Sequence, residues 1–136
     1  MQASDPGGPR LDQGLDGQIY FIRYHFEDNT IQQSYTQGPD DLVSMQVYDQ
    51  TAIPEQPTWN NCINKILPQY QKLYPIMGRF ELGNYDSVVK NAQAIHTVLG
   101  KPVADALHMP VIRDLSILRT NAVLKWIENG TPFGCK

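Results

Sequence analysis

The sequence predicts a mainly α-helical chain with a small antiparallel β element near its N-terminus. Two observations lead to this prediction. In residues 18–26 apolar and aromatic side chains alternate with a period of two, which is typical of a strand. From residue 58 onward they recur at helical spacing in three segments. Isolated helices of about two to four turns are unstable in water, so the three segments are expected to pack together.

The first 17 residues are expected to form a flexible N-terminal arm. They are polar, rich in glycine and proline, and end in the turn signal Asp16-Gly17. This arm lacks the apolar central segment of a signal peptide. The sequence does not indicate the cellular compartment of the protein.

The chain after the arm, residues 18–136, is predicted to be a single domain, because its length is ordinary for one domain. Its β element spans residues 18–50 and its helical unit spans residues 58–132. The predicted strands are Gln18–Phe26, a return strand Thr30–Thr36, and a weaker edge strand Leu42–Tyr48.

The first helix is expected to begin after Thr58, a good N-cap residue. Pro68 falls inside the helical pattern. Because proline lacks the backbone donor and clashes with the preceding turn, a kink or a restart is expected there. The apolar side of this helix is expected to contain Trp59, Cys62, Ile63, Ile66, Tyr70 and Leu73.

Two further helices are predicted downstream. Asp86 is expected to cap the second, which stops at Gly100. Ser116 or Asp114 is expected to cap the last one. The buried stripe of the last helix is predicted to contain Leu118, Ala122, Val123, Trp126 and Ile127.

Composition and motifs argue against several classes of function. The formal net charge is −3 and the eleven Lys and Arg residues are scattered, which disfavours nucleic-acid binding because phosphate contacts need clustered basic side chains. No apolar stretch reaches the roughly 18 residues of a membrane span. The histidines lack metal-ligand spacing, and nucleophile-elbow and phosphate-loop motifs are absent, so no metal or cofactor is expected.

The order of elements over residues 59–132 resembles a small c-type cytochrome domain. The features that carry the resemblance are a helix that runs into residues 70–74, a second helix, Met109-Pro110, and a last helix with Trp126. In that family the first helix runs into CxxCH, an axial Met often precedes Pro, and an aromatic residue of the closing helix packs on the first. Here Tyr70, Leu73 and Tyr74 stand where two cysteines and a histidine would be, so the resemblance implies a haem-less, degenerate domain.

If the resemblance holds, the space left by the haem must be filled, because large cavities destabilise close-packed interiors. The residues expected at this backfilled site, or at a retained small-molecule pocket, are Tyr70, Leu73, Tyr74, Phe80, Met109 and Arg113. Arg113 or Asp114 could serve the buried tyrosine hydroxyls. Taken by themselves, Arg113 is expected to pin the loop before the last helix and Asp114 to stabilise the helix N-terminus.

The two cysteines are too far apart in sequence for a CxxC motif. Cys62 lies on the apolar side of a predicted helix, which favours a buried, inert thiol. Cys135 lies close to the C-terminus. A disulfide between Cys62 and Cys135 that ties the tail to the first helix, or two free thiols, both stay open.

The leading hypothesis is a non-catalytic interaction or accessory module derived from a c-type cytochrome. It would act with a protein partner or in a larger assembly, and a homo-oligomer stays open. The Tyr- and Phe-rich β element, with its unpaired edges, is the expected docking surface. The alternatives are an electron-transfer protein in which Met109 and a histidine hold non-covalent haem, and a small enzyme or ligand-binding protein with a tyrosine-lined pocket.

Overall fold

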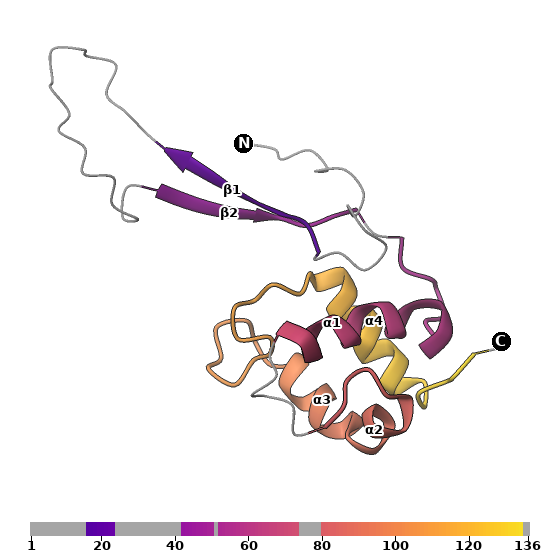
Figure 1. The fold of residues 1–136 in the computed structure, drawn as a ribbon. Helices are drawn as coiled ribbons and strands as arrows, with labels where there is room; N and C mark the ends of the chain where they lie inside the picture. Colours follow the sequence, from indigo (N-terminus) through magenta and orange to yellow (C-terminus); the bar gives the residue numbers. More distant parts are fainter. Residues whose placement is uncertain (1–15, 24–41, 51, 74–79, 135–136) are drawn as a thin grey trace, which may run out of the picture.

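A computed structural model describes residues 16–23, 42–50, 52–73 and 80–134 of the chain. Two paired strands, which we call the ribbon, project to one side of a group of helices, which we call the helical body (Figure 1). This helix-rich architecture with one antiparallel strand pair agrees with the predicted fold class at that level. Within the described residues, no helix combines the length and the apolar character needed to cross a bilayer.

The ribbon consists of β1 (Gln18–Arg23) and β2 (Leu42–Val47), which pair in antiparallel register along their whole length. Aromatic and β-branched side chains favour this extended pairing. The strand predicted from Gln18 is confirmed over its first six residues, and the weaker strand predicted at Leu42–Tyr48 is β2. The return strand predicted at residues 30–36 lies outside the described residues, and among those described β2 is the partner of β1.

The helical body opens with a π-helical turn, η2 (Trp59–Ile63), which continues into α1 (Asn64–Leu73). Thr58 is the predicted cap: its hydroxyl accepts the backbone N–H of Asn61, while the Asn61 side chain accepts the Thr58 N–H. The restart expected at Pro68 is wrong, because α1 continues through this residue, and the kink expected as the alternative stays a prediction. Before the proline, η2 is a π-helical turn, in which hydrogen bonds join residues five apart and not four apart as in an α-helix.

The single helix predicted downstream is divided into α2 (Tyr85–Lys90) and α3 (Ala92–Leu99). The N-cap of α2 is Asn84, not Asp86 as predicted, because the Asn84 side chain accepts a first-turn backbone N–H. Asp86 lies in that first turn, where its charge faces the positive end of the helix dipole. The predicted stop at Gly100 is confirmed.

The last helix, α4 (Ile117–Glu128), is capped by Ser116, one of the two predicted caps, whose hydroxyl accepts the backbone N–H of Arg119. The predicted buried stripe is wrong at its start: Leu118 is exposed and Arg119 is buried. Arg119 shares a helix face with the buried residues three, four and seven positions later. A charged side chain therefore occupies a position where an apolar one was expected.

The apolar core lies between η2 and the helices α1, α2, α3 and α4, and it contains an aromatic cluster. The Trp59 and Trp126 rings are 6.0 Å apart, and the Tyr85 ring is 5.6 Å from Trp59. Leu73, predicted on this apolar side, is 44% exposed at the end of α1. Among the described residues, none from the ribbon belongs to the core cluster or packs against it as a partly buried hydrophobic residue. The buried members of the core are Trp59, Cys62, Ile63, Ile66, Leu67, Tyr70, Val88, Ile95, Leu99, Leu115, Ala122, Val123 and Trp126.

The C-terminal segment returns to the start of η2. The carbonyls of Pro132 and Phe133 accept the backbone N–H groups of Trp59 and Asn60 at 2.9 and 3.1 Å. The indole N–H of Trp126 donates to the same Pro132 carbonyl at 3.0 Å. Backbone donors at a helix start have no intrahelical partner, so this segment satisfies two of them and closes the body.

Candidate functional site

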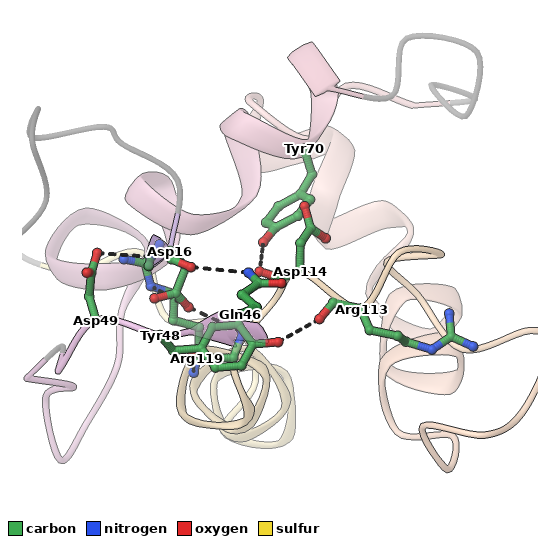
Figure 2. Close-up of polar contacts among 10 residues, drawn as sticks. Asp16, Gln46, Tyr48, Asp49, Tyr70, Arg113, Asp114 and Arg119 are labelled. Atoms are coloured by element: carbon green, nitrogen blue, oxygen red, sulfur yellow. Dashed lines mark hydrogen bonds and ion pairs between the residues drawn. The ribbon is translucent and has the colours of Figure 1, made fainter. Parts of the chain in front are cut away.

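A polar junction connects the base of the ribbon to the start of α4, and Asp16 lies at its centre (Figure 2). The Nε of Arg119 lies 3.3 Å from Oδ2 of Asp16, and these side chains are 9% and 0% exposed. The same Oδ2 accepts the backbone N–H of Ser116 at 3.2 Å. A carboxylate is favoured at a helix N-terminus and beside a guanidinium. Removing Arg119 would leave the buried Asp16 carboxylate without this counter-charge, which is strongly unfavourable.

Residues at and next to the ends of the two strands form further hydrogen bonds at the base of the ribbon. The Gly17 N–H donates to Oδ2 of Asp49 at 3.1 Å, and the Gln46 side-chain amide donates to the Asp16 carbonyl at 3.4 Å. The φ angle of Gly17 is +94°, and a Cβ there would overlap the backbone of Val47, so glycine is required. Asp16 and Gly17, predicted as the end of a flexible arm, therefore belong to the packed part of the chain.

Tyr48 extends the junction to the loop before α4. Its hydroxyl donates to the carbonyl of Arg113 at 2.6 Å. Burial raises the pKa of Tyr48 above its ordinary value, and the charges of Asp16 and Asp114 raise it further. The phenol is therefore held in its protonated, donating form. Nearby, the Tyr70 hydroxyl donates to the Asp114 carbonyl at 3.5 Å.

Arg113 pins the loop before α4, as the sequence predicted. Its φ angle is +62°, a left-handed conformation that is unfavourable for any residue with a Cβ. The planar guanidinium donates to a ring of backbone carbonyls at 2.6 to 3.0 Å. The acceptors are the carbonyls of Val103, Asp105, His108, Pro110 and Val111.

The residues predicted for the backfilled haem site or pocket lie in different surroundings. Tyr70 is a buried core residue, and Phe80 and Met109 are partly buried against the core. Leu73 is exposed, and Tyr74 lies outside the described residues. The Arg113 guanidinium points away from Tyr70 (Figure 2), because the loop carbonyls hold it. The structure therefore does not bring Arg113 and Tyr70 together as two walls of one site.

Cys62 is a buried thiol in the core, in accord with its predicted place on the apolar side of the first helix. Burial raises its pKa, while the positive charges of Arg119 and Lys65 lower it to a smaller extent. Its thiolate, the reactive form, is therefore disfavoured at neutral pH. Cys135 lies outside the described residues, so its disulfide with Cys62 stays a prediction.

The histidines in the described residues have separate partners. Nε2 of His96 lies 3.2 Å from a carboxylate oxygen of Glu128, which connects α3 to α4. His108 is buried, and its Nδ1 lies 2.8 Å from the Lys101 carbonyl. His25 lies outside the described residues. Within them, no group of three or more His, Cys, Asp or Glu side chains could hold a metal ion.

Large apolar side chains are exposed on both faces of the ribbon. Cross-strand partners share a face and successive residues alternate between faces, so Ile19 and Phe21 lie on one face and Tyr20 and Val43 on the other. Ile19, Phe21 and Val43 are 56%, 67% and 55% exposed. The loop that Arg113 pins also presents exposed apolar side chains, namely Val103, Leu107, Val111 and Ile112. Exposed apolar side chains therefore occur in the described residues both on the ribbon and on the pinned loop.

The junction residues were missed from the sequence, because the two partners of the ion pair are far apart in the chain. Asp16 was predicted only as part of a turn, and Arg119 was not predicted to have any role. The one available signal was the position of Arg119 on the apolar face of its helix. Chemically, the buried carboxylate and guanidinium are engaged in holding the chain together.

Comparison of the chain with protein-family models, with curated proteins and with solved structures found no match.

Proposed function

We propose that this chain is a non-catalytic interaction module that binds a protein partner through its ribbon. The observation that carries the proposal is the exposure of large apolar side chains on both faces of a ribbon that lies outside the core. Burial of such surface is the main favourable term in protein association. A two-stranded ribbon is marginally stable by itself, so a partner that covers it would also stabilise it.

The junction gives this docking surface a fixed base. Asp16 and Tyr48 flank the base of the strand pair and hold this one end against the start of α4 and the loop before it through hydrogen bonds and an ion pair. A surface that is already positioned loses less conformational entropy on binding than a free hairpin would. In the described residues each strand also has one edge that faces away from the other, which allows backbone pairing with an extended partner segment.

The experiment compares two lysine variants at positions of equal exposure. Phe21 on the ribbon and Ile112 on the pinned loop are both 67% exposed, so Phe21→Lys and Ile112→Lys perturb the fold to a similar, small extent. Each purified variant is used with chemical crosslinking to capture proteins from an extract of the cells that make the chain. Partners are identified and quantified by mass spectrometry against the wild type.

Phe21→Lys is expected to reduce recovery of a specific partner by at least about tenfold, because a charge in a buried apolar contact removes its binding energy. Ile112→Lys is expected to retain that partner. Equal recovery with both variants, or no specific partner with the wild type, contradicts the proposal. Purified partner and calorimetric titration then give the affinity of each variant directly.

We also propose that the helical body descends from a c-type cytochrome that has lost its haem. The order of α1, α3 and α4, the Trp59–Trp126 contact and the position of Met109 before the last helix support this ancestry. Tyr70 and Leu73 in place of the haem thiols support the loss of the cofactor. Haemin added to the purified chain is therefore expected to give no protein-bound Soret band, and such a band would contradict the loss.

A further inference from the structure

We propose that Asp16 and Arg119 form a latch: when the pair opens, the ribbon swings away from the helical body as a unit and the body stays folded. Opening of the latch changes the position of the docking surface, so this proposal rests on the proposed function. The closed state is the one in the structure, with both side chains at least nine-tenths buried. The open state exposes both charges to water.

The first argument concerns what joins the ribbon to the body. No described ribbon residue packs in the core cluster, so opening would not break apolar core contacts of the strands. Among the described residues, the junction contains the ion pair and hydrogen bonds from Ser116 to Asp16 and from Tyr48 to Arg113. Water can replace such polar contacts after opening, whereas it cannot replace a lost apolar core.

The second argument concerns the charges. In the closed state Asp16 has no exposed surface, and it is the carboxylate next to Arg119. If one partner is neutralised, the other loses this counter-charge while it is still buried, and this penalty exists only while the ribbon is closed. Opening relieves the penalty by hydrating the remaining charge. The chain that follows β2 contains exposed residues, including Gln50 and Ala52, where a change of direction meets no core packing.

The test is amide hydrogen exchange followed by NMR on the full chain. The Ser116 N–H is a direct reporter, because it donates to Asp16 when the latch is closed. In Asp16→Asn, exchange at Ser116 and at the ribbon amides is expected to rise at least about 100-fold, because the buried Arg119 loses the counter-charge of Asp16. Amides within α4 around Val123 are expected to change less than about threefold. Asp86→Asn, the same substitution at an exposed acid of α2, is the matched control and is expected to change neither set.

A second variant separates a latch from general damage. Arg119→Met keeps the length of the side chain without its charge, and by itself it is expected to speed exchange at Ser116. In the double variant Asp16→Asn/Arg119→Met neither charge remains, so exchange at Ser116 is expected to be slower than in either single variant. Equal acceleration of the ribbon and of α4, or additive effects in the double variant, would overturn the latch. These results concern opening alone, so the latch and the proposed partner binding can fail separately.

Discussion

Replacement of Arg113 tests whether one side chain organises the loop before α4. Arg113→Ala removes the guanidinium and keeps the left-handed backbone at φ +62°. Arg113→Gly removes the same donors and also the steric conflict of the Cβ. Arg113→Lys keeps a positive charge but replaces the planar fork with a single ammonium group. The three variants therefore separate hydrogen bonding, backbone strain and charge at one position.

The magnitude follows from the contacts of the guanidinium. It donates to five carbonyls, of which those of Asp105, His108 and Pro110 belong to partly buried contacts. If water largely replaces the two exposed contacts and each partly buried one is worth about 1 kcal/mol, Arg113→Ala lowers the free energy of unfolding by about 3 kcal/mol. Arg113→Gly is expected to be about 1 kcal/mol more stable than Arg113→Ala, because glycine adopts positive φ without strain. Arg113→Lys is expected to fall between wild type and alanine.

Urea unfolding followed by tryptophan fluorescence measures these free energies, since Trp59 and Trp126 are both buried in the core. A loss below about 0.5 kcal/mol for Arg113→Ala would refute the role of the carbonyl ring. Equal stability of the alanine and glycine variants would refute the argument from backbone conformation. Both comparisons require the same dependence on urea, so that the denatured states are alike.

Three further predictions follow from other contacts. Gly17→Ala forces a Cβ onto the backbone of Val47 at φ +94°, so it should lower stability by about 2 kcal/mol or more in urea and speed amide exchange in the ribbon. Trp126→Phe leaves the Pro132 carbonyl without the indole donor and a gap in a fully buried site, so it should lower stability by about 2 to 3 kcal/mol in the same titration, and a change below about 0.5 kcal/mol would contradict this packing. The raised pKa of Cys62 favours the folded state below the thiol's ordinary pKa of 9.0, and this contribution is lost as pH rises through the higher folded pKa. In a Cys135→Ser chain, iodoacetamide at pH 8 should therefore label native Cys62 at least about tenfold more slowly than in the unfolded chain, and equal rates would contradict its burial.

Local signals predicted the ends of several helices correctly. Thr58 and Ser116 each precede a helix and accept a backbone N–H within the next three residues, so their role depends on neighbours in sequence. The same reasoning placed the cap of α2 at Asp86, although Asn84 could serve equally well by residue type. In the structure the backbone of Asn84 is extended and its side chain accepts the backbone N–H of Ser87, and residue type alone does not predict this geometry. The restart expected at Pro68 was wrong, because α1 continues through this proline.

Contacts between distant segments could not be predicted from one sequence. A buried charge is indistinguishable from a solvated one until its partner is known, and the partner of Arg119 lies at the other end of the chain. Leu73 shows the opposite error. It continues the helical spacing of the buried face, but α1 ends there and no element in the described part of the chain covers it, so it remains exposed. Periodicity indicates which side of a helix is apolar and does not indicate how far the neighbouring elements extend.

A polar junction has a consequence for docking that an apolar one would lack. If the ribbon packed on the body through Phe21 or Val43, the side chains available to a partner would be consumed within the chain itself. The Asp16–Arg119 pair and the Tyr48–Arg113 hydrogen bond orient the ribbon through groups at its base and leave both apolar faces outward. Directional polar contacts fix geometry with little apolar area, while apolar burial is non-directional and scales with area. A polar base that fixes the ribbon and leaves its apolar side chains exposed is therefore what the proposed docking role requires.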